Sequence, residues 1–80
     1  MPKAKQLIEG ASFGPEKVAV LGRVFDKAWE QVKAEYQSQK AIEAARLKLA
    51  NIVINLAKEG EHDEWKLRDR AVRTLSVDKA

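Results

Sequence analysis

The segment from Ala44 to Ala57, AARLKLANIVINLA, constrains the fold of this chain more than any other part of the sequence. Its apolar residues repeat with helical spacing, but they do not form the single stripe that is typical of a helix on the surface of a domain. They form two rows, one comprising Ile42, Ala45, Leu49, Ile52 and Leu56 and the other Leu47, Ala50, Ile54 and Ala57. With Val53 between the rows, the apolar face spans about 240°, which is more than one neighbouring helix covers.

Two arrangements would cover both rows. In the first, this helix is the central element of a monomer and has a helix on each side. In the second, one row contacts another copy of the chain. We favour the second, because a domain of 80 residues gains buried apolar surface by oligomerising. The predicted interface of this homodimer, in which alanines allow close approach of the two helices, consists of Leu47, Ala50, Ile54 and Ala57.

The rest of the chain is also helical in pattern, and three helices are predicted at residues 15–37, 39–59 and 63–75. Each has a local start signal: Pro15 at a first helical position, and Ser38 and Asp63 as N-caps. Gly60 ends the second helix, since glycine readily adopts the left-handed conformation that follows many helices. The sequence therefore predicts an all-α three-helix bundle, with residues 15–80 as a single helical domain.

The break between the first two helices is expected within Tyr36–Lys40, YQSQK. The apolar stripes on either side differ in direction by about 120° if one straight helix is assumed, and this favours two helices. No glycine or proline stands in the segment, so a single bent helix of about 45 residues is the alternative.

Residues 1–14 contain one proline and two glycines and show no sustained periodicity. This composition predicts an irregular N-terminal arm. Its apolar side chains, Leu7, Ile8 and Phe13, are expected to anchor the arm on the bundle.

The composition argues against several classes of protein. The chain has no cysteine, and therefore no disulfide, thiol nucleophile or cysteine-ligated metal, which fits a reducing cytoplasm. Its longest uninterrupted apolar run is Val18–Leu21, far shorter than the roughly 20 residues that cross a bilayer. The N-terminus also lacks the apolar core of a secretory signal. We therefore expect a cytoplasmic protein without a membrane segment.

The single histidine, His62, lies in a turn rich in carboxylates, KEGEHDEW. A transition-metal site on a helix would need ligands one turn apart and more than one imidazole. The carboxylates are better explained as a polar turn and as acids that the dipole of helix 63–75 favours at its start. With a single histidine and no glycine-rich phosphate loop, the sequence predicts a protein that is not an enzyme and binds no metal or cofactor.

Nucleic-acid binding is also disfavoured. The net charge of +3 is spread along the chain instead of gathering into a basic stripe. A helix-turn-helix needs a small residue four before the turn glycine and an aliphatic residue six after it, whereas this chain has Leu56 and Lys66 there. Trp29 and Trp65 fall on apolar arcs, so we interpret them as core or interface anchors and not as platforms for stacked bases.

The stretch from Ala44 to Leu75 contains A-R-L-x-L-A, then L-A-x-x-G, an aspartate and a terminal helix. In this pattern it resembles small bacterial helical proteins of uncharacterised function. The resemblance implies a helical fold and carries no catalytic or binding residue with it. We therefore predict a non-enzymatic, self-associating helical protein–protein interaction module, and the alternative is a small nucleic-acid-associated or regulatory protein.

Overall fold

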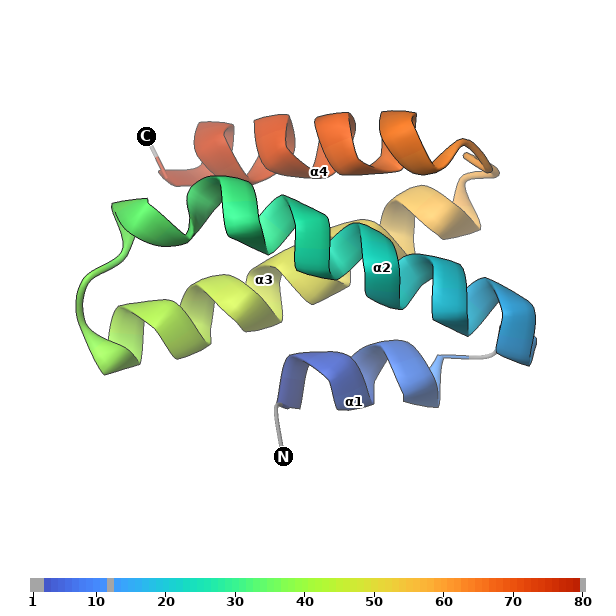
Figure 1. The fold of residues 1–80 in the computed structure, drawn as a ribbon, viewed down its shortest axis with the longest axis horizontal. Coiled ribbons are helices and arrows are strands. Elements are labelled where there is room, and N and C mark those ends of the chain that lie inside the picture. Colours follow the sequence, from blue (N-terminus) through green and yellow to red (C-terminus); the bar gives the residue numbers. More distant parts are fainter. Residues whose placement is uncertain (1–2, 12, 80) are drawn as a thin grey trace.

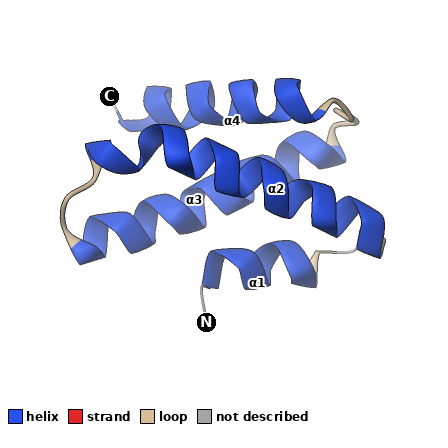
Figure 2. Ribbon diagram, in the orientation of Figure 1, coloured by secondary structure: helices blue, strands red, loops and turns tan. Residues whose placement is uncertain are grey.

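The computed structural model of the chain describes residues 3–11 and 13–79, and Figure 1 shows that helices make up almost all of them. Within these two ranges no residue lies in a β-strand (Figure 2), so the predicted all-α class is confirmed. The elements are α1 (Lys3–Gly10), α2 (Pro15–Val32), the 3-10 turn η1 (Lys33–Glu35), α3 (Gln39–Lys58) and α4 (Glu64–Lys79). None of the described helices combines the length and apolar character that crossing a membrane requires.

The three predicted helices are present as α2, α3 and α4, with shifted ends. The chain leaves α2 through η1 and reverses direction before α3, at the left of Figure 1. Ser38 caps α3, since its Oγ accepts a hydrogen bond from the amide of Ala41 at 3.0 Å. The prediction of two helices is thus confirmed over that of one bent helix. At the other end, α4 continues beyond the predicted end at Leu75, because neither glycine nor proline interrupts the following residues.

Gly60 ends α3 as the sequence predicts. Its φ of 103° lies in the left-handed region, where a side chain would be strained. The amide of Gly60 donates to the carbonyl of Ala57 at 3.1 Å, and the amide of Glu61 donates to that of Leu56 at 3.3 Å. This pair of bonds is a Schellman motif, and it turns the chain sharply from α3 toward α4.

The prediction of an irregular N-terminal arm is wrong. Lys3–Gly10 is helical, and Ile8 is only 1% exposed within the core. An eight-residue helix is not stable alone in water, so packing against the bundle holds α1 in place. The spacing of Ala4, Leu7, Ile8 and Ala11 is the sequence signal for this short helix.

The other three helices all contact α3 (Figure 1), which explains its wide apolar face. Arg46 marks the side that faces α2, because its guanidinium lies 5.0 Å from the ring centre of Phe25. Ala45 marks the side that faces α4, since it lines a cleft together with Leu75. At 100° per residue, the second apolar row lies beyond Arg46, on the side that remains for α1.

The core between these helices is apolar throughout the described residues, with no buried polar or charged side chain among them. Its largest fully buried side chains come from all four helices: Ile8, Leu21, Val24, Phe25, Leu49, Val53 and Leu67. Trp29 packs against the edge of this core, as predicted for a core anchor. Its ring stacks on Tyr36 with 5.7 Å between centroids and lies 5.4 Å from the guanidinium of Arg46.

Candidate protein-binding surface

Three of the four residues predicted for a dimer interface are buried within the protomer. Ala50 is fully buried, and Ile54 and Ala57 are 8% and 6% exposed. All three belong to the same core as Ile8 of α1, and α1 packs against α3, so we infer that α1 helps to cover this row. Leu47 is half-buried. A second copy would reach the three buried side chains only if α1 moved away. The sequence argument did not predict that Lys3–Gly10 would form a helix that packs against α3.

Trp65 is the main departure from the pattern expected on α4. It is 62% exposed, although the sequence places it on the apolar arc of the helix. The buried stripe of α4 is narrow and consists of Leu67, Ala71 and Leu75. Trp65 lies about 120° from the centre of that stripe at 100° per residue, so its ring lies outside the core. Trp65 is therefore not a core anchor.

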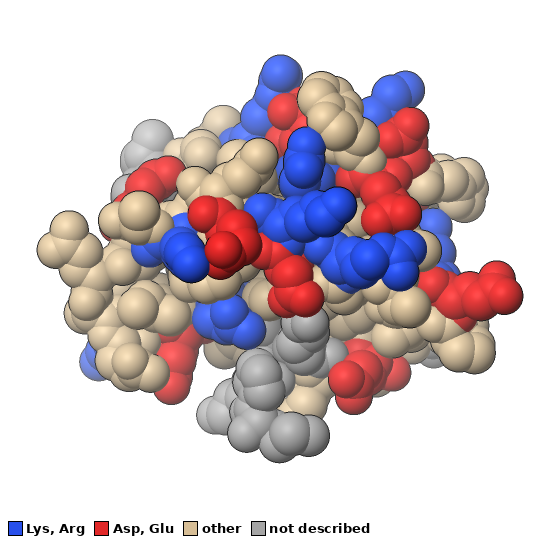
Figure 3. All heavy atoms as spheres, viewed as in Figure 1, with Lys and Arg blue, Asp and Glu red and all other residues tan. Residues whose placement is uncertain are grey.

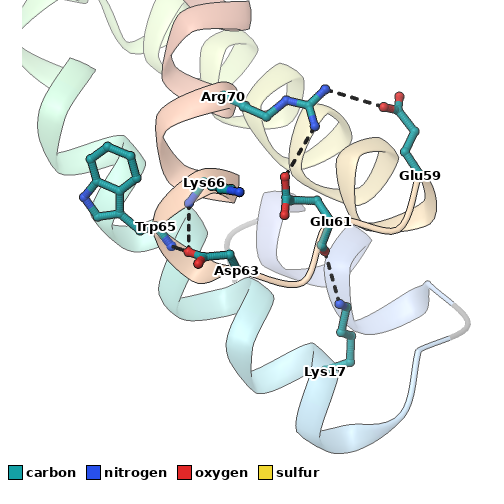
Figure 4. Close-up of polar contacts among 7 residues, drawn as sticks. All are labelled: Lys17, Glu59, Glu61, Asp63, Trp65, Lys66 and Arg70. Atoms are coloured by element: carbon teal, nitrogen blue, oxygen red, sulfur yellow. Dashed lines mark hydrogen bonds and ion pairs between the residues drawn. The ribbon is translucent and has the colours of Figure 1, made fainter.

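The backbone at Trp65 is nevertheless held firmly. Oδ1 of Asp63 accepts hydrogen bonds from the amides of Trp65 at 2.9 Å and Lys66 at 3.2 Å, as Figure 4 shows. Asp63 is thus the predicted N-cap of this helix. An exposed tryptophan on a fixed helical turn differs from one on a loose chain end, because little backbone entropy is lost when a partner covers it.

A shallow cleft of about 250 Å³ lies beside the indole, between α2 and α4. Its lining combines a buried apolar side chain, an exposed aromatic one and three charges: Val24, Lys27, Glu64, Trp65 and Arg68. We call these five residues the Trp65 surface. Sequence analysis singled out only the tryptophan, because the packing of α2 against α4 is what brings Val24 and Lys27 to the side of α4 that carries it.

Within this surface, the negative charge of Glu64 is balanced by an ion pair with Arg23. Nε and Nη2 of Arg23 donate to its two carboxylate oxygens, each at 3.3 Å. The Arg23 hydrogen bonds hold the pKa of Glu64 below its ordinary value, and the positive charge of Lys27 acts in the same direction. Since both partners are about half exposed, the pair adds little to stability. Its effect on the surface is to leave Lys27 and Arg68 as the charges in excess.

The wider face has mixed charge. Figure 3 shows Lys and Arg side chains gathered near its middle, with Asp and Glu side chains interleaved among them. Along α4, Arg73 forms an ion pair with Asp69 at 3.2 Å. Positive charge on the molecule is therefore interrupted by carboxylates.

The acidic turn between α3 and α4 has a structural role. Arg70 lies 3.7 Å from a carboxylate oxygen of Glu59 and 3.6 Å from one of Glu61 (Figure 4). Lys17 reaches the turn from α2, with its Nζ 3.5 Å from the carbonyl of Glu61 and 3.2 Å from Nδ1 of His62. Each of the turn's carboxylates thus has a partner, since Asp63 caps α4 and Glu64 binds Arg23. In the described part of the chain, no three His, Cys, Asp or Glu side chains form a group that could hold a metal ion.

Two further clefts have different linings. One, of about 260 Å³, is mostly apolar and lies beside Tyr36, Ala44 and Leu75. The other, of about 300 Å³, lies between α1 and α2 beside Ile8 and Arg23. Both are at or below the lower end of the roughly 300–1,000 Å³ that is typical of small-molecule sites, as is the cleft at Trp65.

No protein-family model matches the chain, and comparison with curated proteins and with solved structures found no match either.

Proposed function

We propose that this chain is a non-enzymatic helical module that binds another protein through the Trp65 surface. The observation that carries the proposal is the 62% exposure of Trp65 on a capped helix. Tryptophan contributes strongly to protein interfaces, because its ring buries a large apolar area at a low cost in side-chain entropy. An exposed ring that borders a cleft suits such a contact.

The chemistry of the Trp65 cleft supports binding over catalysis. The cleft at Trp65 is small and open, and its one carboxylate is engaged by Arg23. A general acid or base would need a carboxyl group free to meet a substrate proton. The carboxylates of the α3–α4 turn are likewise engaged in capping and ion pairs.

If the chain self-associates, we propose that it does so through the Trp65 surface and not through the second row of α3. A dimer built on the second row of α3 would require the loss of α1 packing, whereas the Trp65 surface is open on the folded protomer. A second copy is thus one protein among those that could occupy the surface. Sedimentation equilibrium of the purified chain measures whether it does.

Affinity capture from the organism that encodes the chain tests the proposal. The bait is the tagged 80-residue chain. It is compared with Trp65→Ala and with the control Val77→Ala, which truncates another exposed apolar side chain of α4. We expect a protein that binds the wild type and Val77→Ala but not Trp65→Ala. Direct titration with that protein, purified, should then show at least a tenfold loss of affinity for Trp65→Ala. Identical sets of bound proteins for all three baits would refute the proposal.

A further inference from the structure

We propose that the Trp65 surface recognises an acidic peptide segment that carries one bulky apolar side chain. This inference rests on the function proposed above and specifies the chemistry of the partner. It follows from the charges on the two sides of the cleft, from the volume of the cleft and from its single exposed aromatic ring.

The charges come from both walls of the cleft. Lys27 lies on α2 and Arg68 on α4, one turn after Trp65, so a bound segment meets a cation on each side. Among the described residues, the only carboxylate in the lining belongs to Glu64, which already accepts hydrogen bonds from Nε and Nη2 of Arg23. A carboxylate on a partner would add favourable pairs with Lys27 and Arg68 without displacing Arg23.

The volume suits a side chain and not a whole folded element. About 250 Å³ beside the indole is less than a drug-sized ligand occupies, and the buried side chain of Val24 forms part of the lining. An aromatic or branched aliphatic side chain would lie between Val24 and the Trp65 ring. Carboxylates next to that side chain in sequence would lie near Lys27 or Arg68.

Single-stranded nucleic acid fits this surface less well. Proteins that bind it present several aromatic rings for successive bases along a continuous basic groove. In the described part of the chain, Trp65 is the one aromatic residue among the exposed large apolar side chains. A peptide can place its few carboxylates next to Lys27 and Arg68, whereas a run of phosphates would also pass the carboxylate of Glu64 in the same lining.

A displayed library of random twelve-residue peptides provides the probe, selected on the wild-type chain and counter-selected on Trp65→Ala. We expect enrichment of sequences in which Asp or Glu flanks Phe, Trp, Leu or Ile. A fluorescein-labelled copy of the best peptide then serves for anisotropy titrations. Its affinity should fall about tenfold in the double variant Lys27→Glu, Arg68→Glu and should weaken as salt is raised.

Lys40→Glu is the control for a single charge reversal away from the site, because it reverses an exposed lysine in the first turn of α3, remote from the cleft. It should leave the affinity unchanged. Replacing the peptide's acids by lysine should restore binding to the double variant and abolish it for the wild type.

Four outcomes overturn the inference, and the first three concern what binds and how tightly. They are selection of neutral or basic peptides, an affinity that the charge reversals do not change, and binding of a labelled twenty-nucleotide single strand by the wild type but not by Trp65→Ala. A library that yields no binder also overturns it. Failure of the function proposed above is a separate result, since it is the case in which Trp65→Ala retains every natural partner.

Discussion

Two apolar regions of this molecule differ in how they are covered. The second row of α3 is an apolar surface within the fold, where Ile54 is 8% exposed, and α1 packs against the same helix. The Trp65 surface lies between α2 and α4, and no described element covers the indole, which is 62% exposed. From the sequence alone, both regions were candidates for contact with a partner. Because a neighbouring helix covers the first region, that region belongs to the core. Because no described helix covers the indole, the second region is the candidate for binding.

The largest expected effect comes from a charge in the covered region. Ile54→Glu places a carboxylate beneath α1 with no partner, and we expect a loss of about 4 kcal/mol or more in the free energy of unfolding. Typical domains have a free energy of unfolding of about 0.05–0.15 kcal/mol per residue, which gives roughly 4–12 kcal/mol for this whole domain. Urea denaturation followed by circular dichroism measures the change.

Leu47→Glu is the matched control for this prediction, because it puts the same charge on the same face at a half-buried position. It should lose less than about 1 kcal/mol and remain folded. Equal losses in the two variants would mean that α1 does not cover the row selectively. A wild-type dimer that Leu47→Glu dissociates would favour the dimer predicted from the sequence.

The next largest effect tests whether α1 is the cover. Ile8→Ala removes a side chain that is 1% exposed and should cost about 2–4 kcal/mol in the free energy of unfolding. Leu7→Ala, at a neighbouring position that is 39% exposed, should cost less than about 1 kcal/mol. Hydrogen exchange of the α3 amides provides a second measurement, and faster exchange near Ile54 in Ile8→Ala alone is expected. If the two variants lost the same free energy of unfolding, the conclusion that α1 is part of the core would be wrong.

A smaller effect on stability is expected in the open region. Trp65→Ala should change the free energy of unfolding by less than about 1 kcal/mol, because most of the ring contacts solvent. Trp29→Ala is the comparison, since that ring stacks on Tyr36 and packs against the core. It should cost about 2 kcal/mol or more in the same urea measurement. A costly Trp65→Ala would assign this tryptophan a structural role instead of a binding one.

The smallest effect concerns the charge balance of the Trp65 surface. Arg23 lowers the pKa of Glu64, so the pair contributes to stability above the ordinary carboxyl pKa and loses its contribution as the pH falls through the lowered value. Arg23→Gln should raise the pKa of Glu64 toward its ordinary value, and Arg23→Lys should give an intermediate value. A carbon NMR titration of the Glu64 carboxyl group measures this shift. If the pKa of Glu64 were the same in Arg23→Gln as in the wild type, Arg23 would not be the group that lowers it.

The sequence by itself determined where α2, α3 and α4 begin and where α3 ends. The residues that set these ends act through hydrogen bonds and dihedral angles within a few positions of themselves, so their effects can be predicted from the sequence. They are Pro15, Ser38, Gly60 and Asp63. The width of the apolar face on α3 was also legible, because it depends only on helical periodicity.

Only the tertiary structure decided which neighbour covers that face and which apolar side chain stays outside. α1 is too short to form without the bundle, so its helical state follows from packing and not from propensity. The exposure of Trp65 depends on where α2 meets α4, and that contact joins residues about 40 positions apart, such as Arg23 and Glu64. Periodicity gives the direction of a side chain around its own helix, whereas burial depends on the position of the next helix.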